Sequence, residues 1–326
     1  MPKLLVCVIR TAKLQQLREQ TLKVTLSNIT SSKTLAAEVK YIDEFDPEGL
    51  DPKFVQAVVK LDQLKTGTEF DGMVKNLHVK HVSQVLKHIK AYEYFKNSSA
   101  DWLLVLEDDT LTSQTVGDQL AKVLKSVPAE YDIINLSCPI PMDIAKSEGV
   151  HEITKHFKFV PTVDAYLVRK SVASKLVDTM APIHFTQTTQ LSFVANKLGL
   201  RIGMHCPNLF VNGSKLGVYL SSIDINNRLF MNPDYNRVFA IMTKPMITDE
   251  DMKDASDILL KTNFKDHPDF QYQLAILHMR RGEYAKSKEL MDKIYNIYLE
   301  NDCIVNSESE FLLNYTRIFR FDQDKP

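Results

Sequence analysis

Residues 102–110 read WLLVLEDDT, an apolar run that ends abruptly in three consecutive acids. Carboxylates a few ångströms apart repel one another, so three of them at the end of a buried strand are costly. Side chains of a strand alternate between its faces, which predicts Glu107 and Asp109 on one face and Asp108 on the other. A solvated acidic turn is one explanation. The other is a site for a hard divalent cation, which binds carboxylate oxygens and would offset the repulsion.

The segments around this run alternate between strand and helix patterns. Apolar runs predict strands at 3–9, 38–45, 102–107 and 131–137, and helical spacing predicts helices at 14–29, 73–95 and 115–126. Strands separated by helices indicate an α/β fold with a mostly parallel, Rossmann-type sheet flanked by helices. Such folds bind ligands at the carboxyl edge of the sheet, and the three acids are expected at that edge.

The chain changes character near Pro245. Residues 207–217 are rich in turn residues and predict an ordered loop. Beyond Pro245 the pattern is almost only helical and begins with a capping-box pattern at Thr248 and Asp251. We therefore expect two domains, 1–244 and a small all-α domain at 245–326. Residues 274–291 are similar to a tetratricopeptide hairpin with Gly282 at its turn, which suggests either a surface for a protein partner or a helical appendage of the first domain.

Composition narrows the class of protein. The 326 residues include 40 basic and 41 acidic side chains, a net charge of -1 that argues against a nucleic-acid binder. No apolar run approaches the ~18 residues of a membrane span, and the first residues predict a strand and not a signal peptide. The four cysteines are far apart and form no CxxC pair. We expect a cytoplasmic protein without a transmembrane segment.

The acidic run and several other segments are similar to one enzyme family. "VLEDD" resembles the metal motif of nucleotide-sugar glycosyltransferases with the GT-A fold, and more narrowly that of glycosyltransferase family 25, the lipooligosaccharide and collagen galactosyltransferases. Five further segments resemble that family in the same order, over roughly residues 3 to 225: LLVCVIRTAKLQQLREQ, QVLKHIKAYEYF, YDIINLS, DAYLVRKSVASKLVD and CPNLFVNGSKLGVYLSSI. The chain departs from the pattern in two places: its first segment reads Val8-Ile9-Arg10 and lacks the usual Asn, with only Arg10 roughly in place, and Lys87 replaces the Ser before His88.

The resemblance implies a GT-A-like enzyme that binds a nucleoside-diphosphate sugar, a UDP-sugar being expected, together with Mn2+ or Mg2+. Glu107 and Asp109 would hold the metal against the diphosphate, and Asp108 would approach the ribose or the sugar. Arg10 and His88 would line the donor site. Lys215, in a glycine-bounded loop, would meet the diphosphate or would simply be solvated.

A transferred sugar also needs a base that takes a proton from the acceptor hydroxyl, of a saccharide or another acceptor. The family carries an Asp in a Pro-Val-Asp segment, where this chain has Pro182, Ile183 and His184. His184 is the first candidate because imidazole titrates near neutral pH, although it can also be a loop residue without a role. Asp164, just before Ala165 and Tyr166, is the second candidate.

The leading hypothesis is thus a metal-dependent, inverting glycosyltransferase. Its rival is a catalytically degenerate relative that acts as a binding or scaffold protein through its helical tail. Two further readings have less support. A zinc site at His78, His81 and His88 lacks a carboxylate or cysteine partner at ligand spacing, and a magnesium-dependent phosphohydrolase would place an Asp after the first strand, where this chain has IRTAK.

Overall fold

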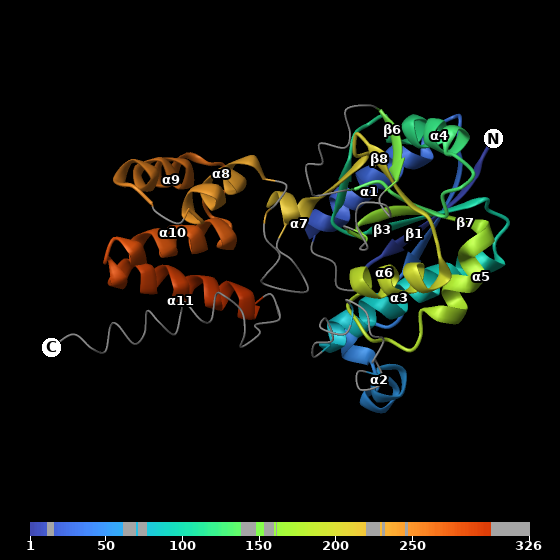
Figure 1. Cartoon of the computed structure of the whole chain (residues 1–326), viewed down its shortest axis with the longest axis horizontal. Coiled ribbons are helices and arrows are strands. Elements are labelled where there is room, and N and C mark those ends of the chain that lie inside the picture. Colours follow the sequence, from blue (N-terminus) through green and yellow to red (C-terminus); the bar gives the residue numbers. More distant parts are fainter. Residues whose placement is uncertain are drawn as a thin grey trace. The chain divides into compact units, whose positions relative to one another are not determined.

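In the computed structural model of the chain, the described residues are 1–11, 16–60, 70, 77–137, 148–152, 160, 162–219, 229, 232–244 and 247–300. They divide into two compact units, Met1–Asn212 and Gly213–Pro326. Each unit is described by itself below (Figure 1).

The first unit is built on a seven-stranded sheet with the order β2-β1-β3-β7-β5-β8-β6. Five strands run in the same direction, whereas β7 and β6 run against their neighbours. The strands are β1 (Lys3–Ile9), β2 (Ala36–Ile42), β3 (Trp102–Glu107), β5 (Ile133–Asn135), β6 (Gly149–Glu152), β7 (Ala165–Arg169) and β8 (Ile202–Cys206). A separate pair is formed by β4 (Thr110–Thr112) and β9 (Phe210–Asn212), which run antiparallel.

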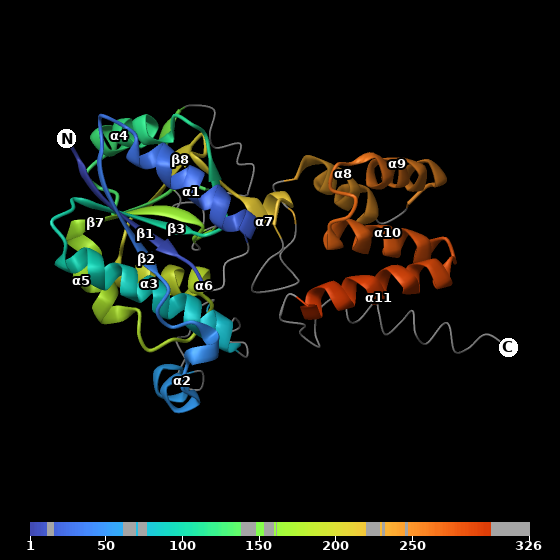
Figure 2. The ribbon, with the colours of Figure 1, turned by 180° about the vertical axis from the view of Figure 1, so that it is seen from behind.

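Helices cover both faces of this sheet. They are α1 (Gln16–Thr30), the 3-10 turn η1 (Pro47–Gly49), α2 (Pro52–Val58), α3 (Val79–Asn97), α4 (Val116–Ser126), α5 (Lys170–Thr179) and α6 (Gln187–Leu198). Figures 1 and 2 show α1 and α4 on one face and α3, α5 and α6 on the other. The predicted α/β class, a mostly parallel sheet flanked by helices and followed by an all-helical part, is confirmed.

Strand β3 lies at the centre of this arrangement and is apolar on both faces. Leu103 and Val105 pack in the core beneath α3, α5 and α6. Leu104 and Leu106 pack in the other core, beneath α1 and α4. A strand that is buried on both sides needs a continuous apolar sequence, which explains why the run before the acids shows no polar alternation.

The second unit contains α7 (Gly213–Leu216), α8 (Pro233–Met242), α9 (Asp249–Lys261), α10 (Pro268–Arg280) and α11 (Tyr284–Glu300). The capping box at Thr248 and Asp251 is present at the start of α9. Helices α10 and α11 form the predicted hairpin, and Gly282 at its turn has φ +74, a conformation that glycine adopts without strain. The tetratricopeptide resemblance stays a prediction, and residues 301–326 of the expected domain lie outside the described residues.

The border between the two units differs from the expected one at 244/245. Helix α8 contributes Tyr235, Val238 and Met242 to a core that it shares with α9 and α10. The composition change near Pro245 marks where the polar helices begin, but the apolar face of α8 already packs with those helices. Residues 245 and 246 themselves lie outside the described residues.

Two other local expectations are wrong. The long helix expected from residue 73 begins at Val79, with His78 as its N-cap: His78 Nδ1 accepts the Lys80 N–H at 3.3 Å. The segment expected to be a loop at 207–217 contains β9 and α7. Within the residues that the structure describes, no helix is both long and apolar enough to cross a membrane.

Candidate active site at the carboxyl end of β3

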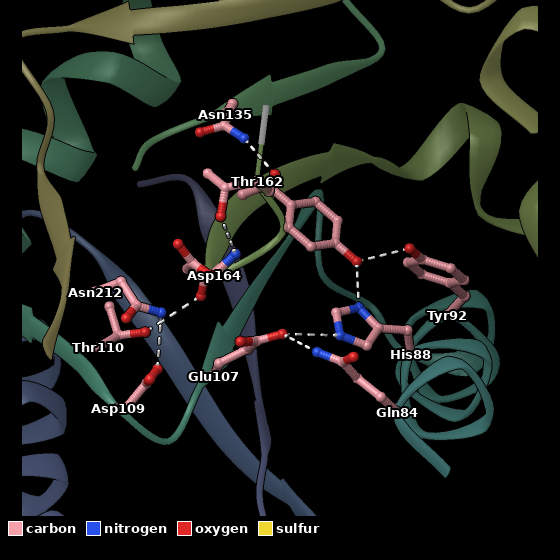
Figure 3. A network of polar contacts seen from close by, with 11 residues as sticks. Gln84, His88, Tyr92, Glu107, Asp109, Thr110, Asn135, Thr162, Asp164 and Asn212 are labelled. Carbon is pink, nitrogen blue, oxygen red and sulfur yellow. Dashed lines mark hydrogen bonds and ion pairs between the residues drawn. The ribbon is translucent and has the colours of Figure 1, made fainter. Parts of the chain in front are cut away.

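The acidic residues lie where two central parallel strands end side by side. In the register of β1 and β3, Ile9 is opposite Glu107. Strand β3 ends at Glu107, and Asp108 and Asp109 form a turn into β4. Strand alternation therefore stops at Glu107 and does not decide where Asp109 points. Figure 3 shows the side chains that gather around this turn.

Glu107 is held on the α3 side of the sheet. Its backbone N–H donates to the Asp164 carbonyl oxygen at 2.9 Å. Its carboxylate Oε1 accepts a hydrogen bond from Gln84 Nε2 at 2.6 Å and lies 3.8 Å from His88 Nε2 (Figure 3). Gln84 and His88 are one turn apart on α3, so one helix face fixes the direction of this carboxylate.

Asp108 faces the opposite side and pairs with α1. Arg18 Nη1 donates to Asp108 Oδ1 at 2.8 Å, and both side chains are largely buried, with 4% and 12% exposed. Burial raises the pKa of Asp108 from 3.8 to about 6, and Arg18 lowers it by less than burial raises it. The neighbouring Asp109 raises it further. The raised pKa of Asp108 therefore reflects first the cost of burying this carboxylate and then its repulsion from Asp109.

Asp109 is buried between the turn and the β4–β9 pair. Asn212, the last residue of β9, donates its Nδ2–H to Asp109 Oδ1 at 3.2 Å (Figure 3). Asn212 is opposite Thr110 in the β4–β9 register, so this small sheet sets its position. Thr25 of α1 donates to the Thr110 carbonyl oxygen at 3.1 Å and ties the turn to the same helix as Arg18.

Asp164 lies directly beside the turn, as the last residue before the antiparallel strand β7. Its carbonyl oxygen accepts from both the Glu107 N–H and the Thr110 hydroxyl. Its own N–H donates to Thr162 Oγ1 at 3.3 Å, and the Thr162 carbonyl accepts from Asn135 Nδ2 at 2.6 Å. The structure thus brings the second base candidate next to the acids, and its side chain is buried.

A buried chain of hydrogen bonds continues from His88 into the core. His88 Nδ1 is 2.7 Å from the Tyr166 hydroxyl, which is 2.6 Å from the Tyr92 hydroxyl. Burial lowers the pKa of His88 to about 3, so the ring is neutral at physiological pH. Burial likewise raises the pKa of both tyrosines above the ordinary value, so both hydroxyls keep their protons.

Arg10 follows β1 and lies at the same edge of the sheet. Its guanidinium pairs with Asp43 at 3.1 Å and lies over the Tyr41 ring, 4.2 Å from its centroid. Its carbonyl oxygen accepts from the buried Lys87 ammonium at 2.7 Å, and Lys87 also pairs with Asp46. Lys87, which replaces a serine of the similar family, therefore ties β1 to the loop after β2.

His184 lies in the loop between α5 and α6, among Phe185, Phe193 and their neighbours. Its Nδ1 is 2.5 Å from the Lys60 carbonyl oxygen, which can only accept, so Nδ1 carries the proton. In the neutral ring the lone pair is then on Nε2, the form that a general base needs. Gln190 of α6 accepts the backbone N–H of His184 at 3.0 Å and fixes the loop. No bond of His184 with the acids is present among the described residues.

Lys215 lies in α7, which belongs to the second unit. The zinc reading of the three histidines on α3 fails locally, because His78 caps the helix and His88 bonds Tyr166.

A metal ion at this turn would need some of its ligands from a bound substrate. Among the described residues, no group of three or more His, Cys, Asp or Glu side chains could hold a metal ion. Mg2+-like ions in nucleotide enzymes take one or two protein carboxylates and complete their shell with water and phosphate oxygens. The donor set fits an ion bound together with a diphosphate, and Glu107 and Asp109 as its ligands stay a prediction.

The sequence did not indicate the residues that hold the acids, Gln84, Arg18 and Asn212. It also did not indicate Thr162, which bonds Asp164, or Tyr92, which bonds Tyr166. Tyr166 lies in a segment that resembles the family. Gln84 lies one helical turn before His88, so the helical spacing could have indicated that the two share a face. Nothing local marks Arg18 or Asn212, since both reach the turn only through tertiary packing.

Comparison with known proteins gives only weak similarity to solved structures. No protein-family model matches the chain, and no curated protein sequence matches it. Among solved structures it is similar to a glycosyltransferase involved in the glycosylation of the major capsid of PBCV-1, at 13% identity and a TM-score of 0.37, over 65% of this chain and 93% of that one. It is also similar to S. aureus TarS 1-349, at 12% identity and a TM-score of 0.37, over 99% of this chain and 92% of that one. The third structure is a CMP:2-keto-3-deoxy-manno-octonic acid synthetase in complex with CTP, at 13% identity and a TM-score of 0.34, over 63% of this chain and 89% of that one. Similarity at this level identifies neither a family nor an activity, so neither is taken from it.

Proposed function

We propose that this protein is a metal-dependent glycosyltransferase that moves a sugar from a nucleoside-diphosphate sugar to a hydroxyl acceptor. The observation that carries the proposal is the acidic turn itself. Three consecutive carboxylates lie at the end of a strand that is buried on both faces of a mostly parallel sheet, at the edge where such sheets bind ligands. Burial raises the pKa of Asp108 and the neighbouring Asp109 raises it further, which is a cost that an exposed surface turn does not carry.

In this proposal each acid has a separate task. Glu107 and Asp109 hold Mn2+ or Mg2+, which supplies positive charge to the leaving diphosphate when it is bound. Asp108 contacts the ribose or the sugar of a UDP-sugar, with its carboxylate oriented by Arg18. Arg10 faces the donor from the end of β1. The contact of Lys215 with a diphosphate stays an expectation from the sequence, because Lys215 belongs to the second unit.

The acceptor hydroxyl loses its proton to His184. The support for this role is the hydrogen bond from Nδ1 to the Lys60 carbonyl, which leaves Nε2 as the basic atom of the neutral ring. Asp164 is the alternative, supported by its position beside Glu107 and Thr110. One base and no covalent intermediate imply inversion at the anomeric carbon. A saccharide is the expected acceptor.

Thermal unfolding of the full chain with a panel of nucleotide sugars tests the proposal, with and without Mn2+. A bound donor raises the unfolding midpoint because ligand binding stabilises the native state by RT ln(1 + [L]/Kd). The donor that stabilises should then release nucleoside diphosphate with Mn2+. A donor that binds without any release, with all acceptors tried, would favour the binding or scaffold alternative. A protein that no nucleotide sugar stabilises would refute the proposal.

A further inference from the structure

Glu107, His88, Tyr166 and Tyr92 form a row of polar contacts, and electrostatics decides which group donates to which. Each tyrosine hydroxyl has one proton to donate, and the neutral His88 ring has one N–H. If Nδ1 carried the proton, Nε2 would present a lone pair to the Glu107 carboxylate 3.8 Å away, which is repulsive. If Nε2 carries it, Nδ1 accepts from the Tyr166 hydroxyl, and Tyr166 in turn accepts from Tyr92.

A second observation points to the same carboxylate. His88 is fully buried, and its Nε2 has no hydrogen-bond partner within the normal distance. A buried donor without a partner is costly, so such groups usually serve a role that the resting structure does not complete. The nearest acid oxygen is Glu107 Oε1, which Gln84 also holds from the neighbouring turn of α3 (Figure 3).

We propose that His88, locked in its Nε2–H tautomer by Tyr166 and Tyr92, is a positioning residue that aims the Glu107 carboxylate at its ligand. This inference rests on the proposed function for the identity of the ligand, but not for the state of the ring. Residues that orient a ligating or reacting carboxylate in this way typically change affinity by ~10- to 100-fold when removed. His88 therefore acts through Glu107 and need not contact the substrate.

The direction of the hydrogen bonds gives the two tyrosines different effects on the His88 ring. In Tyr166→Phe the ring loses the hydroxyl that donates to Nδ1, so only the Glu107 carboxylate still favours the Nε2–H form and the ring is held less firmly. In Tyr92→Phe the Tyr166 proton still goes to Nδ1, and only the donor behind it is lost. We expect a large effect of Tyr166→Phe and a small effect of Tyr92→Phe. With the opposite direction, Nδ1–H would donate to Tyr166 and Tyr166 to Tyr92, so Tyr166→Phe would move the ring from the Nδ1–H towards the Nε2–H form.

The first experiment needs no ligand and no activity. Nitrogen NMR of full-length protein with labelled histidine gives the tautomer of His88, whose signals are assigned by their loss in His88→Asn. We expect the Nε2–H form in the wild type and in Tyr92→Phe, and a smaller excess of that form in Tyr166→Phe, where only Glu107 still favours it. Glu107→Gln should shift the Nε2 resonance. An Nδ1–H ring in the wild type, or an Nε2 resonance that Glu107→Gln leaves unchanged, overturns the inference.

The second experiment measures calorimetric binding of UDP with Mn2+. Tyr166→Phe should weaken binding about tenfold, and Tyr92→Phe should weaken it less. Tyr235→Phe, which removes a buried hydroxyl bonded to Gln273 in the second unit, is the matched control and should bind like the wild type. Equal binding by Tyr166→Phe and the wild type overturns the positioning role. Absence of UDP binding to the wild type contradicts the proposed function instead, while the NMR result still decides the state of His88.

Discussion

Replacing Asp109 with Asn separates the stability of the acidic turn from its proposed function. The amide keeps the shape of the side chain and its Oδ1 still accepts from Asn212, so the contact at 3.2 Å survives as a neutral hydrogen bond. A hydrogen bond to a charged group contributes about 1 kcal/mol more than a neutral one. Asp109 also raises the pKa of Asp108, so removing its charge relieves repulsion and offsets part of that loss.

The two effects nearly cancel in the free energy of unfolding. We expect Asp109→Asn to change it by less than about 1 kcal/mol, and to bring the pKa of Asp108 down from about 6. A neutral amide oxygen is a poor ligand for a hard cation. Binding of UDP with Mn2+ should therefore weaken at least about tenfold, equivalent to about 1.4 kcal/mol, and sugar transfer should fall with it.

Three measurements check this prediction. Urea unfolding followed by the fluorescence of Trp102, the single tryptophan and a residue of β3, reports on the sheet. Carbon NMR of the carboxyl groups gives the pKa of Asp108, and calorimetry gives the affinity for UDP with and without Mn2+. Asp101→Asn is the matched control, because it removes the same charge at the opposite end of β3, where the exposed Asp101 carboxylate accepts from the Lys3 N–H. If Asp109→Asn binds and transfers like this control, Asp109 holds no metal and the turn has another purpose.

Three more predictions concern pH, the base and the border between the units. Asp108 binds its proton more tightly in the folded than in the unfolded chain, because its pKa is raised on folding. Its contribution to the free energy of unfolding is therefore complete below about pH 4, and about 3 kcal/mol of it is lost as pH rises through about 6. A stability difference between wild type and Asp108→Asn that does not change over this range would contradict the prediction. His184→Ala should lower transfer ~10²- to 10⁴-fold and leave the affinity for UDP unchanged, and full activity would move the role to Asp164. A chain cut after residue 244 should aggregate because Tyr235, Val238 and Met242 lose the helices that cover them. A chain cut after residue 212 should stay monodisperse in size-exclusion chromatography. If the shorter chain aggregates and the longer one stays monodisperse, the border between the units is misplaced.

The fold was largely predictable because its determinants are local. An uninterrupted apolar run such as WLLVL has few alternatives to a central strand, and the capping box at Thr248 fixes a helix start within four residues. The expected loop at 207–217 was wrong because β9 is three residues long and exists only through its pairing with β4. The start of α3 was misplaced because apolar spacing alone does not show that His78 caps the helix.

Prediction of the site stopped at the acids themselves. Their position followed from the strand before them, but their partners come from distant parts of the chain: Arg18 is 90 residues from Asp108, and Asn212 is 103 residues from Asp109. No spacing rule connects such pairs. The connection of Glu107 to His88 was closer to reach, since both stood in segments that resemble the same family and the helix precedes the strand directly.

The contacts of the three acids explain how they coexist at the end of one strand. Each is held by a different element: Glu107 by α3, Asp108 by α1 and Asp109 by β9. Arg18 gives Asp108 a positive charge, but burial and Asp109 outweigh it, because the pKa stays raised. Glu107 accepts from the amide of Gln84, and Asp109 accepts from that of Asn212. The fold therefore orients three carboxylates at one edge of the sheet, and a divalent cation is the kind of ligand that binds such oxygens.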